Sequence, residues 1–511
     1  MKTRKFLWAV LPMMATALAL TACGGDDATD TKPVPVSPTD PTDKTEKTEK
    51  SIPYTVTVKG DPETTRATVN ADGKTMNFAD DDELYISDGA DIHGVLTLQS
   101  GAGSDAATFS GTLYYEASTP PNNSTSLTAT LVSSNDQVAQ KSDGKVTGFS
   151  YPTSGNVCST LSEAVSKYSQ LTGTGNYGSG EIVLSQSTAF LKFTVTLEDG
   201  TTGGASVPVE VTSDGSTTIG TGTVSASGTT QFVDIQALFY VPVAGGTVIT
   251  KAASMCVANV GDDDESITYG ASTNKKLTGG NVYTVSKTKD FVRLWANGPV
   301  WRSKNVGATS VTDKGGYYCW GGLVDVTNVT LGWNSNCPFW KSGSATGSRT
   351  DFSNIDLKFS RYVPTASTEY WGGDGNPDNL TTLLPEDDVA TQTLGSPWRM
   401  PTIDEFDNST GLLAKTTKLG TTVNGALGVI YTGKSDYNKK AIFLPTAGDR
   451  VSTGNGTGYG AQETYGIYWS SSLKTDQPYC AQDILSSQTN SASSITYQLR
   501  NYGRNVRAVH D

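Results

Sequence analysis

The chain has few histidines and few cysteines, and it has no long apolar stretch after its first twenty residues. Of its 511 residues, two are histidine and six are cysteine. Two histidines, His93 and His510, give little support to a Ser-His-Asp triad or to a multi-histidine metal site. Because no later segment could span a bilayer, we expect any membrane attachment of the mature chain to be through lipid.

Positive charge is also scarce, with 38 basic against 51 acidic residues and a net charge of -13. Contact with phosphate needs clustered lysine and arginine, so the composition argues against a nucleic-acid or anionic-lipid partner. Only 36% of the residues are hydrophobic, and glycine is abundant. This composition is typical of exported β-sandwiches with many turns.

The N-terminal residues 1–23 have the pattern of a secretory signal. Basic residues precede an apolar run, and small residues lead into Cys23. Resemblance to bacterial lipoproteins implies that Cys23 is lipidated and becomes the new N-terminus. The alternative is an ordinary cleaved signal with an incidental cysteine. Residues 24–51, rich in Asp, Thr, Pro and Lys, are expected to form a solvated tether.

The other cysteines give no clear framework. They are Cys158, Cys256, Cys319, Cys337 and Cys480. An odd number without CxxC spacing is weak support for a disulfide network or a zinc site. Cys319 with Cys337 is the pair to test, and buried free thiols are an equally good interpretation.

Tryptophan is missing between residues 9 and 294, which marks a boundary near Lys289. Before it, short runs alternate apolar and polar residues, as in antiparallel sheets with one solvated face. These runs are residues 54–58, 109–115, 127–131, 193–197 and 236–243. One helix is predicted to begin at the capping box formed by Thr160 and Glu163. We therefore predict a mainly β chain with two tandem antiparallel β-sandwiches, residues 52–175 and 176–289.

The last third contains the densest aromatic segment, residues 396–406. Thr402 and Glu405 form a second capping box, and Gly411 is a plausible end of the helix that follows. Trp398 is expected to pack beside this helix.

The same segment resembles a known family. Residues 398–406, with 387–390 before them, resemble the signature of the Fibrobacter succinogenes major paralogous domain. Further motifs agree in order, at residues 301–308, 316–321, 442–450, 468–472 and 503–509. The resemblance implies an α+β, C-type-lectin-like domain over residues 290–511. That fold serves binding proteins and a few enzymes, so it does not assign a function by itself.

A second resemblance lies near the start of the folded region. Residues 64–69, 73–79 and 82–87 resemble the N-terminal region of the fimbrillin family of the Bacteroidales. It implies a pilin exported as a lipoprotein and built from two β-sandwiches. In such pilins a protease cuts after an early Arg or Lys, and a strand donated by another subunit replaces the first strand. Arg66 is the expected cut site, and an uncut surface arginine is the alternative.

The segment around residues 371–379 is the candidate ligand site. Asn376-Pro377-Asp378 loosely resembles the calcium- and sugar-binding arrangement of C-type lectins. The same steps are ordinary turn chemistry. The candidate residues are Trp371, Asp374, Asn376, Asp378 and Asn379. Calcium at this segment is the only cofactor that the sequence suggests. The acidic runs 80–83 and 262–265 lack the spacing of a calcium loop and fit solvated turns.

Residues 428–435 match the Walker A string literally. A phosphate loop lies between a strand and a helix. Here both flanking segments have strand patterns, so a β-hairpin is the better interpretation.

Together these patterns predict a fimbrial tip subunit without enzymatic activity. It would accept a strand from another fimbrial subunit but not donate one, because the second sandwich continues directly into the aromatic domain. Its other partners would be the outer membrane, through the lipid anchor, and a host or bacterial surface ligand such as a glycan. One alternative is a surface lipoprotein that binds glycans and never polymerises. Another is an enzyme of the sulfatase-modifying kind, which would need paired reactive cysteines.

Overall fold

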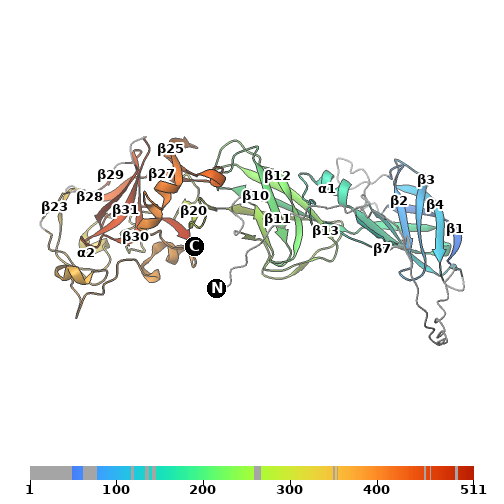
Figure 1. Ribbon diagram of the computed structural model, residues 1–511, viewed down its shortest axis with the longest axis horizontal. Helices are drawn as coiled ribbons and strands as arrows, with labels where there is room; N and C mark the ends of the chain where they lie inside the picture. Colours follow the sequence, from blue (N-terminus) through green and yellow to red (C-terminus); the bar gives the residue numbers. More distant parts are fainter. Residues whose placement is uncertain are drawn as a thin grey trace, which may run out of the picture. The chain divides into compact units, whose positions relative to one another are not determined.

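The computed structural model describes residues 49–60, 78–116, 120–132, 137–140, 146–257, 266–348, 351–353, 355–453, 456–460, 462–489 and 493–511. These residues form many β-strands and a few short helices (Figure 1), so the predicted mainly β fold is confirmed. None of the helices in these ranges is long and apolar enough to cross a bilayer. Cys23, Arg66 and the acidic run 262–265 lie outside the described residues.

The first domain is a closed barrel with the strand order β1-β4-β3-β2-β5-β8-β9. Its strands are β1 (Lys50–Gly60), β2 (Glu83–Ser87), β3 (His93–Ser100), β4 (Ala106–Tyr115), β5 (Ser126–Val132), β8 (Gln170–Asn176) and β9 (Glu181–Gln186). A hairpin, a helix and a turn of 3-10 helix accompany it, namely β6 (Val138–Gln140) with β7 (Val146–Phe149), α1 (Leu161–Tyr168) and η2 (Tyr177–Ser179). Side chains that alternate along the strands, such as Val56, Leu96, Phe109 and Leu184, fill the interior.

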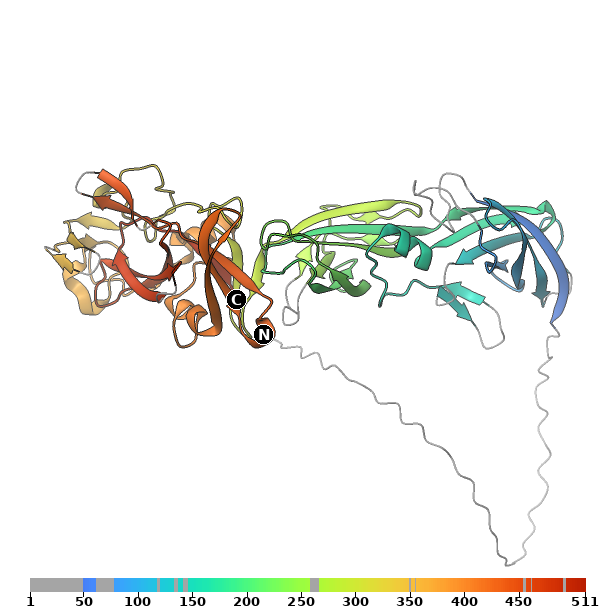
Figure 2. The ribbon, with the colours of Figure 1, turned by 90° about the horizontal axis from the view of Figure 1, so that it is seen from above.

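The barrel differs from the predicted antiparallel sandwich that ends at residue 175. β9 lies beyond that boundary, yet it belongs to the first domain because it pairs in parallel with β1 and closes the sheet. Figure 2 shows β1 in blue beside the other barrel strands.

The second domain is a sandwich of two sheets around an apolar core that includes Phe193, Phe239 and Met255. One sheet has the order β13-β10-β18, with β10 (Thr188–Leu197), β13 (Gln236–Ala244) and β18 (Val282–Lys289). The other has the order β12-β11-β15-β16, with β11 (Ser206–Thr212), β12 (Thr218–Ser225), β15 (Ser254–Val257) and β16 (Ile267–Thr268). β14 (Val248–Ile249) pairs with β17 (Lys275–Lys276). The sandwich is not purely antiparallel, because β10 and β18 run in parallel.

Helix α1 begins where the sequence predicted. The Thr160 hydroxyl accepts from the Glu163 N–H at 3.1 Å, and the Glu163 carboxylate accepts from the Ser159 N–H at 2.9 Å. Ala164 and Val165 on its buried face pack with Phe190 and Tyr240, which belong to the second domain. The helix therefore connects the barrel to the sandwich.

The third domain consists of small sheets and short helices. Its three-stranded sheets are β19 (Phe291–Arg293), β20 (Val300–Asn305) and β33 (Arg507–His510); β25 (Thr416–Val423), β26 (Ala426–Gly433) and β27 (Ala441–Pro445); and β30 (Tyr465–Leu473), β31 (Cys480–Ser487) and β32 (Ser494–Leu499). Its two-stranded sheets are β21 (Trp340–Ser342) with β24 (Lys358–Phe359), β22 (Thr346–Ser348) with β23 (Asp351–Ser353), and β28 (Asp449–Thr453) with β29 (Gly456–Gly460). The helices are α2 (Trp333–Asn336), η3 (Thr365–Tyr370), η4 (Pro385–Asp387), α3 (Val389–Leu394), α4 (Ile403–Phe406), α5 (Leu412–Lys415) and η5 (Ser435–Tyr437).

The sequence motifs of this domain come together around residues 503–509. This segment forms backbone bridges to Tyr318, Arg399, Arg450 and Tyr468, and it pairs with Trp301 on β20. Motifs that are separated by as many as 208 residues in the sequence therefore meet at this segment, which leads into β33.

The second and third domains are joined through the turn that follows β10. Glu198 accepts from the Ser303 hydroxyl at 2.7 Å and pairs with Lys304 at 3.1 Å. Asp199 forms a buried ion pair with Lys289 at 3.1 Å, and its carbonyl accepts from the Ala441 N–H at 2.9 Å. The turn at Asp199-Gly200 is thus a junction between the two domains.

At Gly200 the backbone of the second domain lies too close to the third domain for a side chain to fit. It has a φ of +92°, and a Cβ atom there would lie 2.4 Å from the Ala441 nitrogen. We expect Gly200→Ala to lower the unfolding temperature of the third domain by several degrees, measured by tryptophan fluorescence during heating. Gly204→Ala is the matched control, because Gly204 has a φ of +80° but open space around its Cβ position. Equal effects of the two variants would mean that backbone strain alone matters.

Candidate functional sites

The first candidate site is the position of β1 in the barrel. β1 pairs antiparallel with β4, from Lys50 opposite Tyr115 to Lys59 opposite Ala106, and in parallel with β9 over its last four residues. The end of β1, from Thr57, is therefore paired on both edges, and the earlier part of the strand is paired with β4 alone. A strand that replaced β1 would have to satisfy the same main-chain groups on β4 and β9.

The inner face of β1 carries most of its buried surface. Tyr54, Val56 and Val58 are at most 6% exposed, while Thr55 between them faces solvent. Full burial of each of these side chains stabilises the barrel by roughly 1.5–3 kcal/mol. The Lys59–Glu181 ion pair at 2.7 Å is half exposed and contributes little. β1 is thus held by its ladder and by three alternate side chains.

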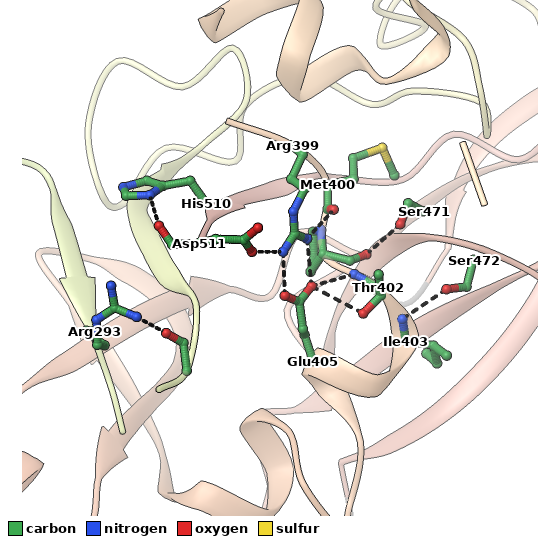
Figure 3. A network of polar contacts seen from close by, with 12 residues as sticks. Arg293, Arg399, Met400, Thr402, Ile403, Glu405, Ser471, Ser472, His510 and Asp511 are labelled. Atoms are coloured by element: carbon green, nitrogen blue, oxygen red, sulfur yellow. Dashed lines mark hydrogen bonds and ion pairs between the residues drawn. The ribbon is translucent and has the colours of Figure 1, made fainter. Parts of the chain in front are cut away.

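A second site of interest is the polar network at the start of α4 (Figure 3). As predicted, the Glu405 carboxylate caps the helix, accepting from the Thr402 N–H at 2.7 Å. The same carboxylate receives two hydrogen bonds from Arg399, at 2.8 and 2.7 Å, and Arg399 also donates to Asp511 at 2.6 Å. The hydrogen bonds to Glu405 are the largest cause of a raised pKa for Arg399. The network therefore fixes the end of β33 to α4, a role for Arg399 that sequence reasoning missed.

The predicted end of this helix is wrong. α4 ends at Phe406 because the Asp407 carboxylate accepts from the N–H groups of Ser409, Thr410 and Gly411 and starts a turn. Gly411 is the residue before α5. Trp398 is only partly buried, with its ring edge-to-face against His510 at 4.6 Å.

Buried arginines form the interior of the third domain. Arg504 is fully buried, pairs with the equally buried Asp483 and lies over the Trp469 ring at 4.6 Å. Arg507 donates to Asn305 at 3.0 Å and to the Phe443 carbonyl at 2.8 Å, and burial lowers its pKa to about 10. These side chains serve packing and chain connection. Sequence reasoning missed this role, although both arginines stand in the 503–509 motif.

Two of the predicted ligand residues bond to the main chain of a neighbouring segment. The Asp378 carboxylate accepts from the Tyr362 N–H at 2.8 Å and the Val363 N–H at 3.0 Å, and Asn379 accepts from the Thr365 N–H at 3.2 Å. These contacts give Asp378 and Asn379 a role in shaping the loop.

Trp371 is partly buried in an apolar cluster, and its indole nitrogen is shielded from solvent. Asp374 and Asn376 are exposed and stay predicted ligand residues. Within the described ranges, no group of three or more His, Cys, Asp or Glu side chains is arranged to hold a metal ion. A calcium role for the loop stays a prediction.

The Walker-like string lies in a β-hairpin, as predicted. β26 contains most of it and pairs antiparallel with β27. The Lys434 ammonium donates to the Ala414 carbonyl at 2.6 Å, and only the three-residue η5 follows.

The cysteines of the third domain are buried, which bears on the enzyme alternative. Cys319, Cys337 and Cys480 form no disulfide, and burial is the main cause of their raised pKa values, about 12 for Cys337. We expect none of the three to react with a thiol reagent within minutes at neutral pH, while all three react after denaturation, as counted by intact mass. Rapid native labelling of Cys319 with Cys337 would instead support paired reactive cysteines.

Comparison with known proteins gives matches to solved structures only. Neither a family model nor a curated protein sequence matches this chain. Similar structures include a putative cell adhesion protein from Bacteroides fragilis, at 12% identity and a TM-score of 0.22, with 48% of this chain and 95% of that chain covered. A putative cell adhesion protein from Bacteroides uniformis is 12% identical with a TM-score of 0.23, and the match covers 46% of this chain and 93% of that chain. The C-terminally truncated tip fimbrial protein of Porphyromonas gingivalis is 11% identical with a TM-score of 0.19, and the match covers 43% of this chain and 80% of that chain. Identity and TM-score are too low for these matches to carry an inference about what this chain does.

Proposed function

We propose that this chain is a subunit of a cell-surface adhesive filament in which a strand from a neighbouring subunit takes the place of β1. The observation that carries the proposal is the position of β1, which is the first described strand and is inserted between β4 and β9. Arg66 follows its last residue, Gly60, by six positions in the sequence. A cut after Arg66 would separate β1 from the rest of the chain without breaking any other barrel strand that the structure describes.

The replacement strand would meet a site with defined chemistry. Main-chain donors and acceptors on β4 and β9 would regain partners, and three alternate apolar side chains would refill the positions of Tyr54, Val56 and Val58. The fimbrillin-like motifs at residues 64–69, 73–79 and 82–87 support this proposal independently of the geometry.

The chain would occupy the end of the filament. The last strand of the sandwich, β18, is paired with β10 and continues through Asp290 into β19. The strand β33 is paired with β20 and fixed by Arg399. Because both strands are already paired within the chain, we propose that it donates neither and presents the third domain outward as a binding domain.

A surface lipoprotein that binds a glycan and does not polymerise is the second candidate. The observation in its favour is that the barrel is already closed with β1 in place. A chain that keeps β1 needs no neighbouring strand, and lipid on Cys23 would hold it at the outer membrane.

Immunogold electron microscopy of intact producing cells separates the two. With an antibody against residues 290–511, the tip proposal predicts gold at filament ends. Gold scattered over the cell surface, without filaments, would rule it out in favour of the lipoprotein. Asp374→Ala with Asn376→Ala should reduce attachment to host cells or glycan arrays if this loop contacts the ligand.

A further inference from the structure

We infer that the outer edge of β18 is a second strand-pairing site, which takes an extended segment of a neighbouring filament subunit. The inference rests on the proposed function and adds to it a second point of contact, on the sandwich. It comes from the direction of the main-chain groups of β18, the exposure of its residues and one unpaired lysine.

The ladder between β10 and β18 fixes which groups of β18 face outward. The Phe190 N–H donates to the Asn281 carbonyl at 3.0 Å at one end, and the Glu198 N–H donates to the Lys289 carbonyl at 3.0 Å at the other. In a parallel ladder, every second residue of a strand bonds to the same neighbour. Tyr283, Val285, Lys287 and Lys289 therefore face β10, and Val282, Thr284, Ser286 and Thr288 direct their N–H and C=O groups outward.

The outward groups have no partner within the part of the chain that the structure describes. β18 is the last strand of its sheet, and no hydrogen bond reaches the main chain of Val282, Thr284, Ser286 or Thr288 from that side. All four residues are exposed. An exposed edge of this length without proline or a bulge can pair with another strand, and the charge of Lys287 restricts which strand can add.

The inner face of β18 predicts what that strand contains. Tyr283 and Val285 pack against the sandwich core but are only partly buried. Lys287 continues the same face and has no ion-pair partner in the described ranges. An added strand would extend the core with apolar residues beside Tyr283 and Val285 and would place an acidic residue beside Lys287.

This segment is distinct from the strand that would replace β1. β1 and β18 both run in parallel with the consecutive strands β9 and β10. Ser187, between β9 and β10, bonds on one side to Gln170 at the start of β8 and to Gly245 after β13. Thr188 bonds on the other side to Gly280, just before β18. β1 and β18 thus pair with the same side of the continuous stretch that β9 and β10 form. β4 is the next strand outside β1, so a strand added outside β18 would be in line with β4 and not with β1. One extended segment cannot occupy both positions, so the neighbouring subunits must supply two.

Site-specific photo-crosslinking in filament-bearing cells tests the inference. A benzophenone amino acid replaces Ser286 at the edge, or Thr194, the register partner of Ser286 on the interior strand β10. We expect a cross-link to a neighbouring subunit from position 286 and at least tenfold less from position 194. Mass spectrometry should map it to an extended segment with alternating apolar residues and an acidic residue. Cross-linking at both positions would mean that a partner covers the whole face, and no cross-link at 286 would overturn the inference.

Two further variants separate this outcome from failure of the proposed function. A benzophenone in place of Ser110, whose hydroxyl lies 2.7 Å from that of Thr55 on β1, reports what occupies the β1 position. A neighbour captured at 110 but not at 286 would refute the edge site and leave the proposed function standing. Capture of only the chain's own β1 at 110 would refute the proposed function. Ser286→Pro removes one outward N–H and no bond to β10, so it should abolish cross-linking from position 284 without changing the unfolding temperature.

Discussion

Replacing Val56 with aspartate is expected to destabilise the barrel by about 3–5 kcal/mol, because the substitution puts a charge or an unsatisfied carboxyl into an apolar interior. Val56 is 1% exposed and lies in the middle of β1, between Tyr54 and Val58. The strand would be held less firmly, so it should also be lost faster after a protease cut between β1 and β2. Urea denaturation of an uncut chain that starts after Cys23 and retains β1, followed by far-ultraviolet circular dichroism, measures the first effect.

The distribution of tryptophan gives this experiment an internal control. Every tryptophan after the signal lies at residue 295 or later. Tryptophan fluorescence therefore reports the third domain, and its transition should not move in Val56→Asp. Thr55→Asp, on the exposed face of the same strand, should cost less than about 1 kcal/mol. Similar losses for both variants would contradict the assignment of the inner face.

The second large effect is expected at Asp483. Its carboxylate and the Arg504 guanidinium are both fully buried, and Asp449 is a more distant partner of Arg504 at 3.4 Å. Asp483→Ala would leave a buried cation poorly compensated, at a cost of about 3–5 kcal/mol. Because Arg504 lies over Trp469, tryptophan fluorescence during urea denaturation should detect the change directly.

A double variant shows whether the loss comes from the uncompensated charge. Asp483→Leu combined with Arg504→Met removes both charges and should be more stable than Asp483→Ala. Asp374→Ala removes an exposed carboxylate of the same domain and should leave the transition within about 0.5 kcal/mol of the parent chain. If Asp483→Ala were as mild as that control, the ion pair would not support the domain core.

The sequence predicted those parts of the fold that depend on local pattern. The alternating runs at residues 54–58, 109–115 and 193–197 lie in β1, β4 and β10, and the capping box at Thr160 begins α1. Closure of the barrel was not predictable in this way. It depends on parallel pairing between β1 and β9, about 125 residues apart, which no local signal specifies.

The candidate sites show the same limit. Glu405 was predicted as a cap because its spacing from Thr402 is a local signal, whereas its ion pair with Arg399 depends on how the chain enters the helix. Arginine side chains usually face solvent unless they are paired. The burial of Arg504 and Arg507 depends on their partners Asp483 and Asn305, which lie far away in the sequence, so it could not be inferred from the local pattern. Asp378 and Asn379 have the residue types of a ligand loop, but their side chains bond to the main chain of residues 362–365.

The N-terminus of the chain recovered from the surface of producing cells tests the central claim most directly. If a neighbouring strand replaces β1, mass spectrometry should find the chain starting at Ala67, with the peptide that contains Lys50–Gly60 absent from it. A chain that starts at an acylated Cys23 and retains that peptide would contradict strand replacement and leave the glycan-binding lipoprotein as the better account.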